Sequence, residues 1–306
     1  MGTPDFGVPV LRSLVASTYD VVAVYTRPDR PAGRGRQPMP SPVKRAAVEA
    51  CIPVVEPLSL REEMSGPTLL DWRPDLVVVA AFAYLLPPAV LSAPRHGCLN
   101  VHPSLLPRYR GSSPVATALL NGDTETGVSI MLMDSGLDTG PVLSQGRVAI
   151  GDDDTTGSLT MRLAELGARL LLRTIEGWLG GRLEPRPQRA DEATFSARIT
   201  AGEGRLNWSL PAAVLGRQVR AYHPWPGSHT AWKGQRLKVH SAVALPMQHP
   251  QPPGTVIELP KPLSVGVVTG EGVLALRSIQ LEGKREVAAE EFVRGHRDFL
   301  GAHLDS

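Results

Sequence analysis

The chain has 306 residues, of which 42% are hydrophobic and 20% are charged, and its formal net charge is +2. This is the composition of an ordinary globular protein, long enough for two domains of typical size. No apolar run approaches the length of a membrane span, and no basic segment followed by an apolar one opens the chain, so we expect a cytoplasmic protein without membrane association. The two cysteines have no metal-ligand spacing around them, which argues against a disulfide framework or a zinc site.

Strands and helices are predicted to alternate along the first 180 residues. A β-branched strand is expected over residues 20–26, a helix capped by Ser41 over 41–50, and a nearly continuous apolar strand over 75–81. A parallel sheet buries strands of the last kind on both faces. A long helix with leucines at helical spacing is expected over 155–180. This order predicts a doubly wound, Rossmann-like α/β domain.

Asn100 and His102 lie at the end of a predicted buried strand over residues 97–102. Because they are two residues apart, their side chains should project from the same face. Pro103 prevents His102 from starting a helix. Imidazole exchanges protons near pH 7 and, when charged, stabilises a developing oxyanion, whereas a carboxamide donates without titrating. The pair is suited to acyl transfer, and the alternative is a structural histidine at a strand end.

Asp138 follows another predicted buried strand, over residues 126–134, and lies in a loop bounded by glycines. A carboxylate near the end of a neighbouring strand could orient the imidazole of His102 and stabilise its charged form, which raises the pKa. The alternative is ordinary turn chemistry, because aspartate is common in glycine-rich turns.

A loop rich in Pro, Gly and Arg is expected over residues 27–45 and carries six basic residues against one acidic residue. Guanidinium groups spaced by glycines on an otherwise acidic domain are suited to contact with a phosphate backbone. The alternative to phosphate contact is an ordinary charged surface that faces solvent. The basic residues proposed for this contact are Arg27, Arg30, Arg34, Arg36 and Lys44.

Residues 183–204 lose periodicity and gather Pro, Arg, Glu and Gly, which predicts an exposed linker. We therefore expect a catalytic domain over 1–182 and a second domain over 205–306. The second domain should begin with a helix and continue with short strands at 234–245, 254–259, 264–269 and 272–280, as in a small barrel. Its 12 basic and 8 acidic residues give it the same sign of charge as the arginine-rich loop, so both could face one polyanion.

Two motifs in order resemble the folate-dependent formyltransferase family. The first is Asn-x-His-x-Ser-Leu-Leu-Pro at 100–107, and the second is Gly-Val-Ser-Ile-Met-Leu-Met-Asp-Ser-Gly-Leu-Asp-Thr-Gly-Pro at 127–141. The opening turn at 2–6, the arginine-rich loop and short segments at 224–226 and 282–284 extend the resemblance over nearly the whole chain.

The resemblance implies transfer of a formyl group from 10-formyltetrahydrofolate to the α-amino group of methionine esterified to initiator tRNA. Asn100 and His102 would hold the formyl oxygen, and Asp138 would orient His102. The arginine-rich loop would meet the tRNA acceptor arm, and an OB-like second domain would help to hold the tRNA. No metal is implied, and a monomer is expected. The residues that match the family's folate-contacting segment are Ser104, Leu105, Leu106 and Pro107.

The resemblance also implies a strand directly before Gly2, where this chain has only Met1. Either the start codon is misassigned or the sheet lacks a central strand. Two other functions stay open. The same domain could formylate a small amine, such as a nucleotide sugar or glycinamide ribonucleotide, which would leave the arginine-rich loop without an obvious role. A non-catalytic nucleic-acid-binding protein with a decayed formyltransferase domain is the other alternative.

Overall fold

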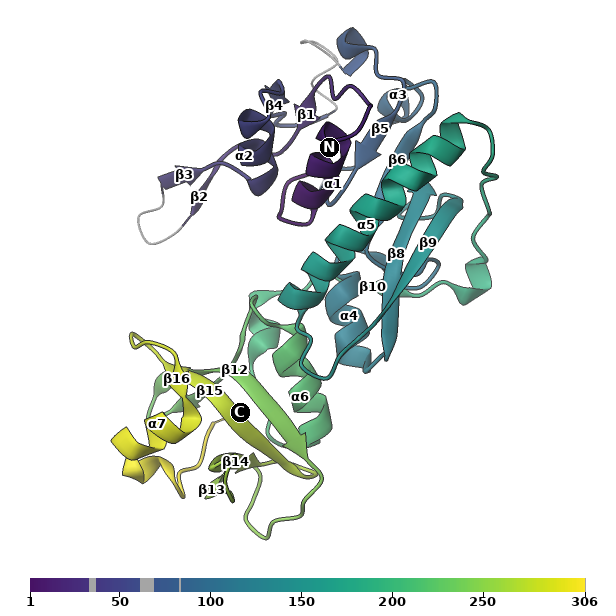
Figure 1. Cartoon of the computed structure of the whole chain (residues 1–306). Coiled ribbons are helices and arrows are strands. Elements are labelled where there is room, and N and C mark those ends of the chain that lie inside the picture. The colour runs from purple at the N-terminus through teal and green to yellow at the C-terminus, as the bar shows by residue number, and fades with distance from the viewer. Residues whose placement is uncertain (33–36, 61–68, 83, 306) are drawn as a thin grey trace. The chain divides into compact units, whose positions relative to one another are not determined.

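The computed structural model describes residues 1–32, 37–60, 69–82 and 84–305 (Figure 1). The chain divides into two compact units. The first comprises residues 1–114, 125–149 and 160–196, and the second comprises 115–124, 150–159 and 197–306. Within the described residues, no helix is both long enough and apolar enough to cross a membrane.

The first unit contains a four-stranded sheet and, among its two-stranded sheets, a smaller parallel one. In the larger sheet, β5 (Val77–Val79) pairs in parallel with β6 (Cys98–His102), which pairs antiparallel with β8 (Glu125–Leu132). At the other side of β8 lies β9 (Val142–Ala149), again antiparallel. The smaller sheet is a parallel pair formed by β1 (Val24–Tyr25) and β4 (Val54–Val55). The predicted α/β class is confirmed, and the larger sheet is mixed rather than parallel throughout.

Helices connect and cover these strands. They are α1 (Gly7–Val15), α2 (Pro42–Glu49), α3 (Pro88–Leu91), most of α5 (Thr156–Leu179) and a 3₁₀ turn over Leu69–Trp72. Helix α4 (Pro114–Asn121) belongs almost wholly to the second unit. The predicted start of α2 is confirmed, because the Ser41 hydroxyl accepts a hydrogen bond from the Lys44 amide at 3.0 Å. An antiparallel hairpin of β2 (Arg30–Ala32) and β3 (Gln37–Met39) precedes this helix.

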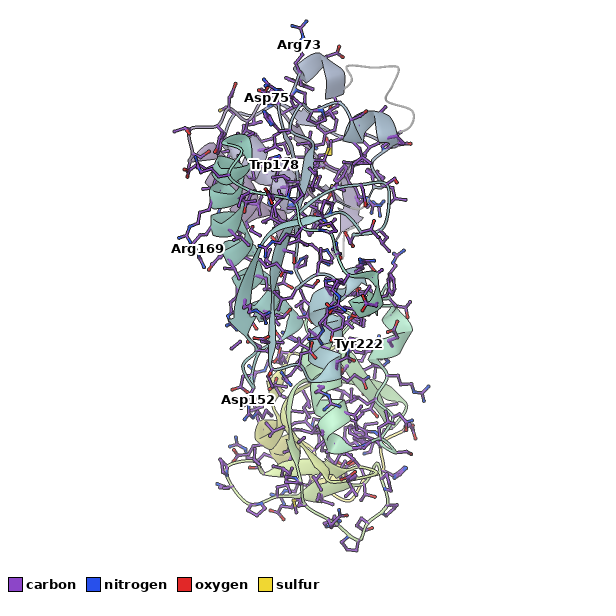
Figure 2. All side chains as sticks on the ribbon, turned by 90° about the vertical axis from the view of Figure 1, so that its right-hand side faces the viewer. Arg73, Asp75, Asp152, Arg169, Trp178 and Tyr222 are labelled. Carbon is purple, nitrogen blue, oxygen red and sulfur yellow. The ribbon has the colours of Figure 1, made fainter. Side chains whose placement is uncertain are left out.

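Helix α5 lies along β6, β8 and β9 (Figure 1). Gly167 permits this close approach, because a Cβ atom at that position would lie 2.7 Å from Val101 Cγ1. Near the other end of the helix, Trp178 donates its indole N–H to the carbonyl of His96 at 2.9 Å (Figure 2). The helix therefore both covers the sheet and anchors the loop that leads into β6.

Met1 and Gly2 occupy the position between β1 and β5. The Met1 amine donates to the Val78 carbonyl at 2.6 Å, and the Ala80 amide donates to the Met1 carbonyl at 2.9 Å. On the opposite side, the Gly2 amide donates to the Tyr25 carbonyl at 3.0 Å. Two residues thus make the backbone contacts that a strand would make at this position of the sheet.

A cavity of about 340 Å³ lies beside these two residues. Apolar side chains from α1, β1, β5 and α5 line it, among them Val10, Leu11, Val24, Val77 and Ile175. Burial lowers the pKa of the Met1 amine from 8.0 to about 5. The folded chain therefore carries both a cavity lined in large part by apolar side chains and a buried amine that resists protonation.

An extension of five β-branched apolar residues before Met1 is expected to raise the melting temperature. The added residues would pair with β1 and β5, and each newly buried aliphatic side chain contributes about 1.5 to 3 kcal/mol. In the unextended chain, lowering the pH from 8 to 5 should reduce the free energy of unfolding, because the unfolded amine binds a proton that the folded amine excludes.

The extended chain should lose this pH dependence, since its amine is no longer buried at Met1. Thermal and urea unfolding at pH 5 and pH 8 measure both effects, with a glycine–serine extension of equal length as the control. Equal melting temperatures for the three chains would contradict the prediction.

The second unit is a β-rich half-barrel. Its antiparallel strands follow the order β11 (Ser228–Trp232), β12 (Gln235–Leu245), β15 (Val273–Leu281), β14 (Val265–Val268) and β13 (Val256–Glu258), with β16 (Val287–Ala288) also paired to β15. Helices α6 (Ala212–Ala221) and α7 (Ala289–Gly295) accompany the sheet. The core includes the buried side chains of Trp208, Leu237, Leu274, Ile279 and Phe299. The predicted barrel-like domain is confirmed, and β11, β16 and α7 are additions to it.

The segment at 183–204 departs from the prediction of a simple exposed linker. Most of its side chains are exposed, but β10 (Phe195–Ser196) pairs in parallel with β7 (Arg110–Gly111). Two 3₁₀ turns, Ala190–Glu192 and Ala201–Gly204, flank this short strand. Residues 183–196 therefore still belong to the first unit and contribute a short strand to it, and the second unit resumes at residue 197.

Candidate active site

Strand β6 places Asn100 and His102 on one face, as their spacing predicts. Asn100 has an exposed fraction of 9% and His102 one of 4%, so both polar groups are nearly removed from water. On one side, β5 pairs with Asn100, and on the other side β8 pairs with both residues. A central strand of a packed sheet thus holds the two side chains in a defined direction.

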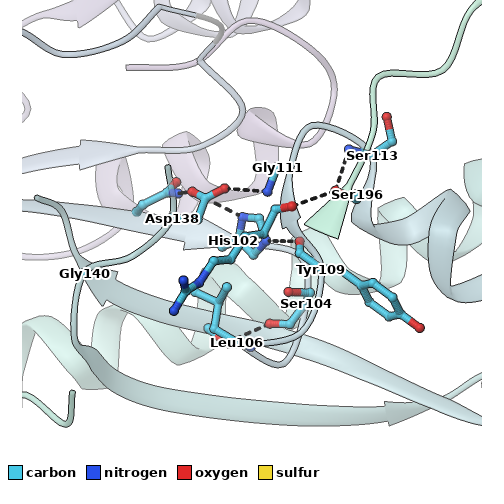
Figure 3. Close-up of polar contacts among 12 residues, drawn as sticks. His102, Ser104, Leu106, Tyr109, Gly111, Ser113, Asp138, Gly140 and Ser196 are labelled. Carbon is cyan, nitrogen blue, oxygen red and sulfur yellow. Dashed lines mark hydrogen bonds and ion pairs between the residues drawn. The ribbon is translucent and has the colours of Figure 1, made fainter. Parts of the chain in front are cut away.

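Asp138 lies in the loop after β8 with a positive φ of 52°. The Asn100 carboxamide nitrogen donates to its Oδ1 at 3.3 Å, and the Gly111 amide donates to its Oδ2 at 2.9 Å. The Nδ1 atom of His102 lies 3.7 Å from Oδ1 (Figure 3). The structure therefore brings together all three residues that the sequence predicts for catalysis.

The imidazole of His102 is held from both sides. Its Nε2 atom lies 3.1 Å from the Tyr109 carbonyl oxygen, and since a carbonyl can only accept, Nε2 carries the proton. Burial lowers the pKa of His102 below its ordinary value of 6.5, and this outweighs the Asp138 carboxylate and the Tyr109 carbonyl, which raise it. Asp138 therefore acts in the predicted direction and raises the pKa of His102, but the loss of hydration is larger, so the net pKa is lowered. The imidazole is neutral at pH 7.

The segment 104–107, predicted to contact folate, is anchored on β8 and β9. The Ser129 hydroxyl donates to the Ser104 carbonyl at 2.7 Å and accepts from the Leu106 amide at 3.0 Å. The Gln145 carboxamide donates to the Leu106 carbonyl at 2.8 Å. The buried Ser104 hydroxyl donates to the Arg108 carbonyl at 2.6 Å. Polar groups of the segment thus form hydrogen bonds within the protein. The half-buried Leu105 and Pro107 are its more accessible residues.

Sequence reasoning missed three residues of 183–204 that support the site. Thr194 accepts the Tyr109 amide on its hydroxyl at 2.9 Å, and Ser196 accepts the Ser113 amide at 3.2 Å (Figure 3). Gln188 contacts the loop that carries Asp138. Small polar residues in an aperiodic, proline-rich stretch give no local signal of such contacts.

The residues predicted to contact phosphate fall into different environments. Arg30 is exposed, and the Arg27 guanidinium lies 4.9 Å from the centre of the Tyr84 ring. Lys44 donates to Asp29 at 2.9 Å and to Glu56 at 2.7 Å, so two carboxylates compensate its charge and raise its pKa. Arg34 and Arg36, predicted for the same contact, lie outside the described residues.

Two family models match the chain, the formyl transferase model over residues 1–175 and the formyl transferase C-terminal domain model over 198–297. The α/β unit with its Asn–His–Asp group, followed by the half-barrel, is thus a formyl transferase architecture, and the chain belongs to this family.

Among proteins similar to it is the methionyl-tRNA formyltransferase of Xanthomonas axonopodis pv. citri, 48% identical over 97% of this chain and 96% of that protein. The methionyl-tRNA formyltransferase of Methylococcus capsulatus is 45% identical over 96% and 95%, respectively.

Solved structures share the fold at lower identity. The N-formyltransferase from Helicobacter canadensis, in complex with folinic acid and dTDP-3-aminofucose, is 18% identical with a TM-score of 0.64, over 94% of this chain and 97% of that one. HypX from Aquifex aeolicus in complex with tetrahydrofolic acid is 18% identical with a TM-score of 0.58, over 80% and 43%. Structures of this fold therefore include proteins with folate derivatives bound.

Replacing Asp138 with Asn is expected to lower the pKa of His102 further. The carboxylate is the main influence that raises this pKa against burial, and an amide at the same position removes the charge while keeping the shape. The pKa can be read from the imidazole signals in an NMR pH titration of the free protein. An unchanged or higher pKa in Asp138→Asn would show that the carboxylate does not act on His102.

Proposed function

We propose that this chain transfers a formyl group from 10-formyltetrahydrofolate to the α-amino group of methionyl initiator tRNA. One observation carries the proposal: the largely buried Asn100 and His102 side chains both contact the half-buried carboxylate of Asp138. The identity to methionyl-tRNA formyltransferases over nearly the whole chain supports this choice of substrates. The intact group also argues against a decayed, non-catalytic domain.

Asn100 is suited to stabilise the oxygen on which charge develops. A carboxamide has two N–H donors, and one of those of Asn100 is used by Asp138. The second N–H is available to the formyl oxygen, whose negative charge increases as the amine attacks the carbonyl carbon. Because the site is largely removed from water, a single donor there is more effective than it would be in solution.

His102 is suited to act as a base rather than as a preformed cation. Its lowered pKa keeps the imidazole neutral at pH 7, so that it can take up the proton that the attacking amine must lose and then pass it to the folate nitrogen as the bond from that nitrogen to the formyl carbon breaks. The Asp138 carboxylate, 3.7 Å from Nδ1, then stabilises the imidazolium that forms. This role replaces the oxyanion contact that the sequence suggested for His102.

The segment 104–107 offers a rigid, partly apolar surface for the folate. Leu106 is buried against Met131 and Val142, and the backbone of the segment is bonded to Ser129 and Gln145. Bound there, 10-formyltetrahydrofolate supplies the formyl carbon and the leaving nitrogen. Leu105 and Pro107 would contact its ring system through apolar surface, and Ser104, whose hydroxyl is used internally, would contribute through its backbone.

Contacts with the tRNA are assigned to the basic loop as the sequence predicts. Exposed Arg30 is accessible to a phosphate as it stands. Lys44 would need to leave Asp29 and Glu56 first, so we rank it below the arginines. Arg27, Arg34 and Arg36 complete the proposed group.

His102→Ala and Asn100→Ala are each expected to reduce kcat by about a hundredfold or more, since proton-transfer and oxyanion-stabilising groups have effects of this size. Formylation of methionyl initiator tRNA by each purified variant measures the loss, with circular dichroism to verify folding. His249→Ala, in the second unit, is the matched histidine control and should keep its kcat. Near-normal turnover by folded His102→Ala would contradict the catalytic assignment. If the unmodified enzyme formylates an amino-sugar nucleotide faster than methionyl initiator tRNA, that result would favour the small-amine alternative.

The double variant Arg34→Ala, Arg36→Ala is expected to raise KM for the tRNA and leave KM for the folate unchanged. For each arginine that binds a phosphate, its replacement should reduce the slope of log affinity against log salt concentration by about 0.9. Titrations of tRNA at several salt concentrations measure this slope, and Arg182→Ala, exposed just beyond the end of α5, is the matched control. A parallel loss of folate affinity would mean that the loop shapes the active site instead.

A further inference from the structure

We propose that Gln188 is a positioning residue that holds Asp138 beside His102. This inference rests on the function proposed above and adds to it a residue of the mostly exposed segment 183–204, in the part that belongs to the first unit. Gln188 touches neither the imidazole nor the carboxylate. It acts through the backbone of the loop that presents Asp138 and through the strand β7.

The carboxamide of Gln188 is fully hydrogen-bonded. Its Oε1 accepts from Arg110 Nε at 3.1 Å and from Arg110 Nη2 at 2.9 Å. Its Nε2 donates to the carbonyl of Asp138 at 2.9 Å and to that of Gly140 at 2.7 Å. A carboxamide has two acceptor lone pairs and two N–H donors, so each of its four positions is in use.

Together with the contact made by Gly111, these hydrogen bonds hold Asp138 at both its side chain and its backbone. Arg110 and Gly111 are the two residues of β7, and they hold the Asp138 loop at different points. Gly111 donates directly to the Asp138 carboxylate at 2.9 Å, while Arg110 reaches the Asp138 backbone through Gln188. The side chain and the main chain of one residue are thereby tied to the same short strand.

Asp138 requires such support because its backbone has a φ of 52°, in the left-handed region that non-glycine residues adopt at a cost. Without the two bonds to its own carbonyl and that of Gly140, the loop could relax to a lower-energy backbone conformation. The carboxylate would then move away from His102.

Glutamine is the residue type that the site needs. The Arg110 guanidinium, with an exposed fraction of 6%, can only donate, and the two loop carbonyls can only accept. One side chain must therefore accept on one side and donate on the other at the same time. An ionised glutamate only accepts and a lysine only donates, whereas methionine has a similar length and does neither.

The hydrogen bonds of Gln188 have an electrostatic consequence for His102. The Asp138 carboxylate raises the pKa of His102 against the effect of burial, and this influence depends on the distance between them, 3.7 Å from Oδ1 to Nδ1. Loss of the Gln188 bonds should therefore lower the pKa of His102, in the same direction as Asp138→Asn, without any change in the catalytic residues themselves.

The test is an NMR titration of His102 in the free protein, with kcat and KM measured in parallel. Gln188→Met should lower the His102 pKa and reduce kcat by about tenfold or more, and both KM values should change little. In a chain that already carries Asp138→Asn, adding Gln188→Met should shift the pKa no further, because the two substitutions act through one group. Arg189→Ala, whose exposed side chain pairs only with Asp191 and Glu192 in the described structure, is the neighbouring control.

Gln188→Asn keeps both kinds of hydrogen-bonding group on a shorter side chain and should give a smaller shift in the same direction, which provides a second folded variant if Gln188→Met unfolds. An unchanged His102 pKa in either folded variant would overturn the proposal, as would a full additional shift in the Asp138→Asn background. The titration uses no substrate, so absence of formyl transfer by the unmodified protein would overturn only the proposed function.

Discussion

The contact between the half-buried Asp138 carboxylate and the buried His102 imidazole is the constraint on which the geometry of the site depends. Burial alone would keep His102 neutral, and the carboxylate partly offsets that effect without reversing it. Asn100 and Gly111 each donate to one oxygen of Asp138 and so stabilise a charge that would be unfavourable in a dry environment. The result is an imidazole that is neutral at pH 7, beside a carboxylate that favours its protonated form.

The geometry of this contact comes from strands rather than from side chains alone. Strand β6 directs Asn100 and His102 to one face, and β7 supplies the amide of Gly111 and, through Arg110, a link to Gln188. Pairing of β10 with β7 ties these groups to a segment that is otherwise mostly exposed. Catalytic groups held by secondary structure keep their positions within the narrow limits that proton transfer requires.

Elsewhere in the first unit, polar contacts decide which charges are available to a partner. Lys44 lies between Asp29 and Glu56 and is compensated within the protein, whereas Arg30 is exposed. Contacts within the protein also satisfy the backbone groups between β1 and β5. Met1 and Gly2 satisfy ladder groups on both sides, yet an apolar cavity remains beside them.

Local pattern in the sequence determined the α/β class, the Ser41 cap, the strand that carries Asn100 and His102, and the two motifs that indicate the family. Such features depend on neighbouring residues, because strand alternation and capping act over a few positions. Tertiary structure alone decided the mixed direction of the larger sheet, the partners of Lys44, the lowered pKa of His102 and the hydrogen bonds of Gln188, which lies 78 residues from Arg110. The physical reason is that dehydration and long-range hydrogen bonds depend on which distant segments pack together, and the pKa of His102 is a balance of opposing effects of that packing.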